Sequence, residues 1–439
     1  MMQFNLMAKM AVGFRQSPDQ QLSNLNQLKD GPLEQRLAYA VMLQEVLGPE
    51  EAIERLSEID EAVEQEQARI KEVNPDAEDP EFPTESQLKL REVVGQMFDR
   101  YANGNYGNEE LAEEDRQLLT SKFGWVGTLA QTPKKSPNKK LRKELENEGT
   151  RAFTVAITIF IMGVLLVLAA FVALALIFAM MMLNQIYVRY RNDGKNSQIY
   201  IETFAIWIVL FFALQLGLSL VGSLIGDPAA GMALSLVAFF GSLIVLIWPV
   251  RRGIPFRQVR KDIGWEINNP IEEVVVGCFS YLALLIPMMM GLVVTTMLGA
   301  GLALMDASSE FQSMGPAGHP IAEEIASGNL MTWLFVFLSA CVAAPIVEET
   351  MFRGVLYRSL RESSGRSYPK WYSIAFSSVL GGLIFAMIHP QGLIGIPVLT
   401  TLAIGFSLVR EWRSSLIGPM VMHAINNSVV TCMILILLA

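Results

Sequence analysis

Long apolar runs dominate the C-terminal two-thirds of the chain, and short polar segments separate them. A helix needs about 20 apolar residues to span the hydrocarbon core of a bilayer. The runs predicted to span a membrane are Ala152–Leu183, Phe204–Ile225, Met232–Val250, Val274–Leu304, Leu330–Val347, Trp371–His389, Gly392–Val409 and Leu416–Leu438. We therefore expect an all-α fold, a polytopic helical membrane bundle of about eight spans.

The first third of the chain has a different pattern, in which apolar residues recur at helical spacing among many charged ones. Thr84 and Gln87 have the spacing of a capping box, which predicts a helix start. A further helix is expected from Asn108 to Lys122. Residues 1–133 are therefore predicted to form an acidic soluble helical domain, and residues 134–151 a basic linker to the membrane.

Composition agrees with this division. Hydrophobic residues make up 52% of the chain and charged residues only 18%, whereas soluble proteins carry about 25% charged residues. Residues 1–150 hold 18 Lys or Arg and 28 Asp or Glu, against 16 and 15 in residues 151–439. The net charge of −9 thus arises in the N-terminal third, and no basic stripe favours nucleic-acid binding. The three cysteines lie far apart without a CxxC pair, so no disulfide framework is expected.

The connections between the predicted spans differ in charge. Alternate connections, which include 251–261 and 358–370, contain every Lys and Arg between the spans, while the others, which include 305–329, contain none. The positive-inside rule makes the basic set cytoplasmic. That orientation puts residues 1–150 on the opposite side, which conflicts with the basic segment before the first span. Either these residues are translocated, which we favour, or the run 152–183 does not cross once as a simple helix.

Ionisable and amide side chains within these spans are the candidates for chemistry, because an ionisable residue there costs at least about 2.5–3.5 kcal/mol on insertion scales. They form one group each on the fifth, sixth and eighth spans: Glu348, Glu349 and Arg353; His389; His423 and Asn427. Two of the chain's three histidines belong to this set. We assign no role to the third, His319, which lies in a predicted loop.

Spacing gives the members of the first group different roles. Glu349 and Arg353 are four residues apart, so they share a helix face and can form an ion pair. Glu348 is rotated about 100° away and shares a face with Phe352 instead. Because Glu348 lacks a built-in partner, it is the better candidate for a base that activates water.

The other two groups offer complementary chemistry. Phe385 precedes His389 by one helical turn, which places an aromatic ring beside the imidazole. His423 and Asn427 share a face and can donate hydrogen bonds to an oxygen that becomes negative. Taken alone, each group has a structural explanation, such as a local ion pair or interhelical hydrogen bonds. Three complementary groups on three helices favour a catalytic site.

These residues form three motifs in a fixed order near the C-terminus. Residues 348–354 read EExxxRG, residues 385–389 read FxxxH and residues 423–427 read HxxxN. The set resembles the signature motifs of the CPBP family (CAAX-processing and bacteriocin-processing, Abi-type) of intramembrane glutamic proteases. The Ras-converting CAAX endopeptidase belongs to this family. The resemblance implies that residues 251–439 form an intramembrane protease core, which residues 152–250 precede with N-terminal membrane helices.

The resemblance also implies a role for each motif residue. Glu348 matches the catalytic glutamate, and His389 matches its partner in activating water. His423 and Asn427 match the pair that stabilises the tetrahedral oxyanion. The residues expected to support the site structurally are Glu349, Phe352, Arg353 and Phe385.

We therefore predict an integral, multi-pass membrane endopeptidase, located in the cytoplasmic membrane if the source is bacterial. It would hydrolyse a peptide bond of a membrane-associated polypeptide, a prenylated one included, without a cofactor. Its partners would be membrane lipid and the polypeptide substrate, not nucleic acid, and the partner of the N-terminal domain is unknown. We expect the site's cavity to open toward the cytoplasmic side, because Glu348 lies near the inner end of its predicted span.

Two alternatives stay open at this point. The first is a zinc-dependent membrane peptidase in which Glu348, His389 and His423 bind the metal, since Glu and His are ordinary zinc ligands. The chain has no HExxH motif to strengthen that reading. The second is a non-catalytic membrane protein, such as an immunity factor, a scaffold or a transporter, that uses its buried polar residues to join helices or to carry protons.

Overall fold

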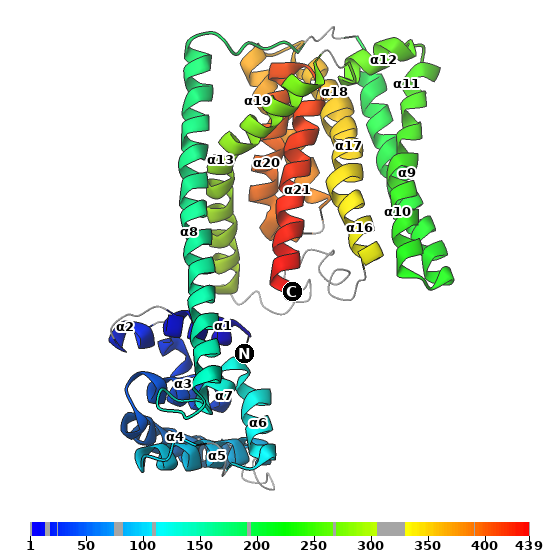
Figure 1. Ribbon diagram of the computed structural model, residues 1–439. Coiled ribbons are helices and arrows are strands. Elements are labelled where there is room, and N and C mark those ends of the chain that lie inside the picture. Colours follow the sequence, from blue (N-terminus) through cyan, green and yellow to red (C-terminus); the bar gives the residue numbers. More distant parts are fainter. Residues whose placement is uncertain are drawn as a thin grey trace. The chain divides into compact units, whose positions relative to one another are not determined.

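The computed structural model describes residues 2–13, 18–23, 25–73, 82–107, 111–190, 195–266, 269–304, 330–389 and 391–438. They fall into two compact units, Met1–Val164 and Leu165–Ala439. Helices and turns, with no strand, account for the described residues, so the all-α prediction is confirmed (Figure 1). His319, the connection 305–329 and the expected helix start at Asn108 lie outside the described residues.

The first unit is a cluster of short helices. In chain order these are α1 (Met2–Gly13), α2 (Pro18–Ser23), the 3-10 turn η1 (Asn26–Leu28), α3 (Leu33–Val46), α4 (Pro49–Val73), α5 (Glu85–Ala102), α6 (Glu113–Phe123) and α7 (Trp125–Ala130). The predicted capping box begins α5, since Thr84 Oγ1 accepts from Gln87 N at 3.3 Å and Gln87 Oε1 accepts from Thr84 N at 2.9 Å. The helix expected from Asn108 to Lys122 is α6, which begins later, at Glu113.

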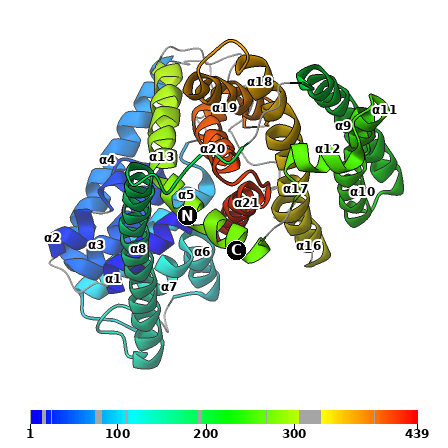
Figure 2. The same ribbon diagram turned by 90° about the horizontal axis from the view of Figure 1, so that it is seen from above.

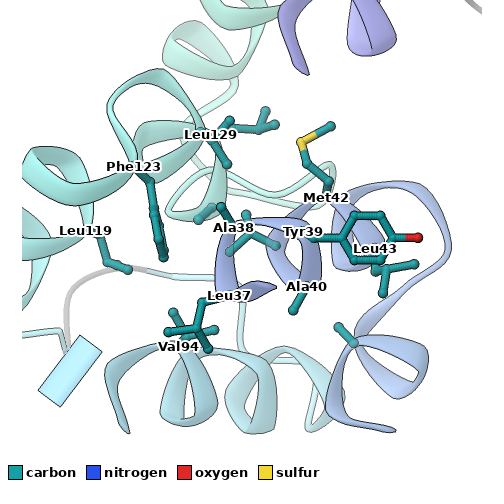
Figure 3. Packing of buried hydrophobic residues seen from close by; sticks show 14 of the residues in the cluster. Leu37, Ala38, Tyr39, Ala40, Met42, Leu43, Val94, Leu119, Phe123 and Leu129 are labelled. Atoms are coloured by element: carbon teal, nitrogen blue, oxygen red, sulfur yellow. The ribbon is translucent and has the colours of Figure 1, made fainter. Parts of the chain in front are cut away.

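Helix α3 forms the centre of this unit's core. Its residues from Leu37 to Glu45 are buried without interruption, as expected for a helix that is covered on all sides. Val94 of α5, Phe123 of α6 and Leu129 of α7 pack around it (Figure 3). The first unit thus has an apolar core of its own despite its acidic surface.

The segment expected to be a basic linker is largely helical. Residues 139–151 form the first turns of α8 (Lys139–Met182). Arg142 of this segment is buried, and its Nη2 atom donates to Glu45 Oε1 of α3 at 2.6 Å. This ion pair therefore joins α8 to the core of the first unit.

The helices from α8 onward include long apolar ones. After α8 come α9 (Ser197–Ile225), α10 (Pro228–Ser242), η2 (Leu243–Leu246), α11 (Ile247–Arg251), α12 (Phe256–Ile263), α13 (Pro270–Leu304), α16 (Leu330–Leu338), η4 (Ser339–Ala343), α17 (Ala344–Glu349), η5 (Thr350–Leu356), α18 (Tyr357–Ser364), α19 (Lys370–Met387), α20 (Gly392–Arg413) and α21 (Ile417–Leu438). Among the described residues, eight helical segments are long and apolar enough to cross a membrane. Each contains much of one predicted span, which confirms a polytopic bundle.

Two spans differ from expectation in a way that affects the site. Helix α8 is unbroken over 44 residues, or about 66 Å, so the run 152–183 has the geometry of a single crossing. The fifth span continues from Met331 to Ser364, well beyond the predicted end at Val347. Glu348 therefore lies near the middle of this helical segment and not at its end.

The membrane helices of the second unit are arranged around the fifth span. The helices α9 and α10 form a hairpin on one side of α16 and α17, while α20 and α21 lie on the other side (Figures 1 and 2). Helix α13 packs against α20 and α21, and α10 packs against α16, η4 and α17. The fifth span is therefore in a position to present side chains toward both groups of helices.

The loop-charge orientation can be tested with single cysteines in a variant whose native cysteines are replaced by serine. Asp227 lies in the exposed α9–α10 turn, and Arg257 is exposed on α12, after the next span. We expect Asp227→Cys to react with a membrane-impermeant maleimide in intact cells, and Arg257→Cys to react only after permeabilisation. Glu64→Cys on α4 should behave like Asp227→Cys if the first unit is translocated. The reverse pattern at positions 227 and 257 would show that the orientation is wrong.

Candidate active site

The fifth span is not a regular helix where it carries the site. The segments η4 and η5 on either side of α17 are π-helical, a form often found at functional sites. In η4, Ala344 N donates to Ser339 O, five residues back. The next residue, Pro345, has no N–H, so the carbonyl of Ala340 receives no backbone hydrogen bond in this register. The irregular backbone thus leaves an acceptor that another helix can use.

Asn427 of α21 uses that acceptor. Its Nδ2 atom donates to Ala340 O at 2.7 Å, and its Oδ1 atom accepts from Asn426 Nδ2 at 3.3 Å. An amide nitrogen has two hydrogens, so Asn427 keeps one that the contact with Ala340 does not use. The sequence analysis suggested Asn427 as a donor at the site and allowed an interhelical hydrogen bond as the structural alternative, but it did not identify Ala340 as the partner.

The predicted ion pair of Glu349 and Arg353 is present. Arg353 Nη1 lies 3.0 Å from Glu349 Oε1, and both side chains are almost fully shielded from solvent. Arg353 also donates to Ala403 O of α20 at 3.2 Å, and its guanidinium lies 4.6 Å from the ring centre of Phe385 and 5.0 Å from that of Phe406. Aromatic faces stabilise a cation. The pair therefore fixes α20 against the fifth span, as expected for a structural role.

Gly354, the last residue of the first motif, has a packing role. A Cβ atom at this position would lie 3.1 Å from both the Cβ and the carbonyl oxygen of Ile263, at the end of α12. That spacing is tighter than nine in ten Cβ contacts. Glycine therefore lets α12 approach the fifth span directly beside Arg353.

Glu349 has a second partner that the sequence did not reveal. His423 Nδ1 lies 2.8 Å from Glu349 Oε1, the same oxygen that accepts from Arg353. With Nδ1–H donating to the carboxylate, the Nε2 atom of His423 faces the other way, toward Glu348 Oε2 at 3.9 Å. The ring also stacks on Phe406 with 5.4 Å between ring centres. Glu349 therefore sets both the position and the tautomer of His423.

Glu348 also faces the imidazole ring of His389. His389 Nε2 lies 3.7 Å from Glu348 Oε2. Its Nδ1 atom lies 2.6 Å from the carbonyl oxygen of Phe385, and so donates to it, and the Phe385 ring centre is 4.2 Å from that of the imidazole. In the neutral ring, Nε2 is then an acceptor aimed at a carboxylate. Two acceptors that face each other can both bind the hydrogens of one water molecule.

A cavity of about 1230 Å³ contains these groups. The four residues predicted to be catalytic all line it: Glu348, His389, His423 and Asn427. Of the four predicted supporting residues, Phe385 lines the cavity, and Phe352 packs edge-on against Phe385 with 5.1 Å between ring centres. Glu349 and Arg353 lie behind this wall. The structure thus brings the predicted set together from the fifth span, the eighth span and the turn after α19, where His389 lies beyond the helix end at Met387.

The cavity does not open where the sequence suggested. At the end nearer α18 its lining stops at Phe239, Phe385 and Leu402, whereas at the other end it reaches Gly226 and Asp227 in the α9–α10 turn. That turn belongs to the connections without Lys or Arg. By the loop-charge orientation, the cavity therefore extends toward the non-cytoplasmic side, and an opening toward the cytoplasm is not supported.

The structure adds nothing that favours the zinc hypothesis. Among the described residues, no group of three or more His, Cys, Asp and Glu side chains is arranged to hold a metal ion. Binding of zinc by Glu348, His389 and His423 stays a prediction, which metal analysis of the purified protein can test.

Comparison with known proteins finds a family whose model matches the part of the chain that carries this site. Residues 330–429 match the family model described as type II CAAX prenyl endopeptidase Rce1-like. The match supports the assignment of this region to the CAAX protease family. No curated protein and no solved structure gave a significant match. The matched segment runs from α16 into α21 and contains all three motifs. The match and the eight apolar helices support a multi-pass CAAX-type protease in general terms, and the match covers neither the first unit nor the α9–α10 hairpin.

The buried ion pair of this CAAX-type site can be tested by Glu349→Gln. This change leaves Arg353 buried without a counter-charge, so we expect the free energy of unfolding to fall by about 3–5 kcal/mol. The measurement is denaturant or thermal unfolding in detergent. The double variant Glu349→Gln/Arg353→Met removes both charges and should recover much of the lost stability. A single variant as stable as the parent protein would contradict the structural role of the pair.

Proposed function

We propose that this CAAX-type protease hydrolyses a peptide bond of a membrane-associated polypeptide, using water activated by Glu348 and His389. The observation that carries the proposal is the meeting of Glu348 Oε2 with two imidazole Nε2 atoms, at 3.7 and 3.9 Å, on the wall of the cavity. The name of the matched family supports a prenylated CAAX polypeptide as the first substrate to try.

Water activation follows from the arrangement of acceptors. A water molecule between Glu348 and His389 donates one hydrogen to the carboxylate and one to Nε2. Glu348 takes a proton as the oxygen attacks the carbonyl carbon, which forms a tetrahedral intermediate. The same proton then passes to the nitrogen of the leaving amine as the carbon–nitrogen bond breaks. No covalent bond to the protein is needed.

Stabilisation of the oxyanion falls to the other two residues. Asn427 offers the Nδ2 hydrogen that is not used by Ala340. His423 carries a hydrogen on Nε2 only when the ring is doubly protonated, and Glu349, at 2.8 Å from Nδ1, is the counter-charge for that form. Donors held in place before the reaction stabilise developing charge without a reorganisation cost.

Glu348→Gln tests the role of the carboxylate. An amide cannot take the proton, so turnover of a farnesylated peptide with a C-terminal CAAX sequence should fall to the uncatalysed level. The protein should stay folded, because Glu348 Oε2 has no hydrogen-bond partner to lose. Glu202→Gln on α9, outside the cavity, is the matched control and should cleave normally. Near-full activity of Glu348→Gln would reject the mechanism. Other substrates can be sought by comparing the protein termini found in cells that carry the parent protein with those found in cells that carry Glu348→Gln.

Asn427→Ala separates a catalytic donor from a helix tie. Loss of an oxyanion donor slows the chemical step by about a hundredfold to a thousandfold. Loss of an interhelical hydrogen bond alone costs about 0.6–2 kcal/mol of stability and leaves the folded fraction active. Because Asn427 holds Ala340 and also faces the cavity, we expect both effects in single-turnover cleavage and thermal unfolding.

The matched control for this variant is Ser242→Ala on α10, outside the cavity, which loses the interhelical hydrogen bond from Trp207 Nε1 to Ser242 Oγ at 3.0 Å. It should lower stability without a comparable loss of rate per folded molecule. If Asn427→Ala gives that same pattern, Asn427 is a tie alone and the proposed oxyanion role is wrong.

A further inference from the structure

The α9–α10 hairpin lies outside the segment that matches the protease family, yet it forms one wall of the catalytic cavity. The face of α9 that lines the cavity carries polar side chains at intervals of one turn, namely Gln215, Ser219 and Ser223. Ser235 of α10 lines the cavity beside them. Polar side chains in the middle of a span are costly unless they have partners or a function. Ser223 Oγ donates to Leu220 O of its own helix at 2.8 Å, so Gln215 and Ser219 are the polar groups on this face that call for an explanation beyond membrane insertion.

Three contacts hold the hairpin as one unit. Near its α18 end, Trp207 Nε1 donates to Ser242 Oγ at 3.0 Å. In the middle, Ser235 Oγ donates to Gln215 Oε1 at 3.1 Å. Near the turn, the backbones approach so closely that a Cβ atom on Gly222 would lie 2.9 Å from the Cα atom of Gly231. The wall is thus fixed along its length.

The hairpin is also fixed against the catalytic span. Phe204 and Trp207 of α9 pack on Phe352 of η5, with 5.3 and 5.8 Å between ring centres. Ser359 Oγ of α18 donates to Ser197 O at the start of α9, so α9 and the fifth span run antiparallel. Counting along both helices from these contacts places Gln215 beside residue 341 of the fifth span. That position lies about 10 Å from Glu348 along the axis of the fifth span. An extended chain covers that distance in about three residues.

Gln215 has hydrogens to offer in this position. Its Oε1 atom is taken by Ser235, while its Nε2 atom has no acceptor among the described residues. On the opposite wall, Gln391 Oε1 is a buried acceptor without a donor. A polypeptide backbone supplies both carbonyl oxygens and N–H groups at regular intervals. The cavity is also larger, at about 1230 Å³, than the roughly 300–1000 Å³ of a small-molecule site.

We propose that the α9–α10 wall binds the backbone of the substrate, with the Gln215 amide donating to a carbonyl oxygen about three residues from the scissile bond. Gln215 is then a positioning residue that acts through substrate binding, outside the family's catalytic segment. The proposal rests on the proposed function, because it takes an extended polypeptide segment as the occupant of the cavity.

A first experiment measures the kinetics of Gln215→Leu on the farnesylated CAAX peptide. Removing a neutral hydrogen bond to the substrate should raise KM about threefold to tenfold, with kcat within about twofold of the parent value. The matched control is Gln198→Leu on the same helix, where the side chain faces Glu202 and not the cavity. An unchanged KM in a folded Gln215→Leu protein would overturn the proposal. A fall in kcat without a rise in KM would also overturn it.

A second experiment does not depend on turnover or on the folding of Gln215→Leu. The photoreactive residue benzoylphenylalanine replaces Leu216, which lines the cavity, in a Glu348→Gln background; Val209, outside the cavity on the same helix, is the control position. The farnesylated peptide should cross-link at position 216 and not at 209, and excess unlabelled peptide should compete.

The two proposals can fail separately. Cleavage by the parent protein without cross-linking at 216 rejects the wall and keeps the proposed function. Cross-linking at 216 without any cleavage by the parent protein supports the wall and rejects the proposed reaction on this peptide. Absence of both rejects the wall as a binding surface for this peptide.

Discussion

The carboxylate of Glu349 is the contact on which the rest of the site depends. One of its oxygens accepts from Arg353 of the same span and from His423 of α21. Arg353 in turn holds the Ala403 carbonyl of α20. A buried charge is tolerated only when it is paired and hydrogen-bonded. The same pairing that stabilises the bundle therefore orients an imidazole at the cavity, so stability and site geometry share one set of atoms.

The fifth span shows how irregular backbone is accommodated inside a membrane helix bundle. Backbone groups at membrane depth need partners from the protein, because no water is available in the hydrocarbon core. Pro345 removes one donor, the π-helical register leaves the Ala340 carbonyl without a backbone partner, and Asn427 takes its place. The fifth span and the helix of the third motif are thereby held in register. Asn427, which its motif marks as a candidate catalytic residue, therefore also makes a structural contact with Ala340.

Local features were predictable from the sequence, and contacts between distant segments were not. Hydropathy and length located the eight spans, and the i,i+4 spacing gave the pair of Glu349 and Arg353. The contact of Glu349 with His423 joins residues far apart in sequence, and no local pattern encodes it. The sequence prediction ended the fifth span too early, at Val347, because the last turns of this helical segment carry charged residues. In the structure those charges are buried and paired, as with Arg358 and Glu362 at 2.7 Å.

The closed and open ends of the cavity bear on which substrates can reach Glu348. At the α18 end, edge-on aromatic contacts of Phe352 with Phe204 and Phe385 fill the space beyond Glu348 and His389. Behind them, a buried ion pair between Arg358 and Asp262 occupies the helix ends. The cavity therefore extends from Glu348 toward the end that holds the α9–α10 turn. Under the proposed function, a polypeptide presented on that side meets the polar hairpin wall before the Glu348 carboxylate, whereas one on the opposite side has to enter laterally between the helices. In the proposed function, the orientation of the bundle thus decides which substrates can reach Glu348, as the motif residues decide the reaction.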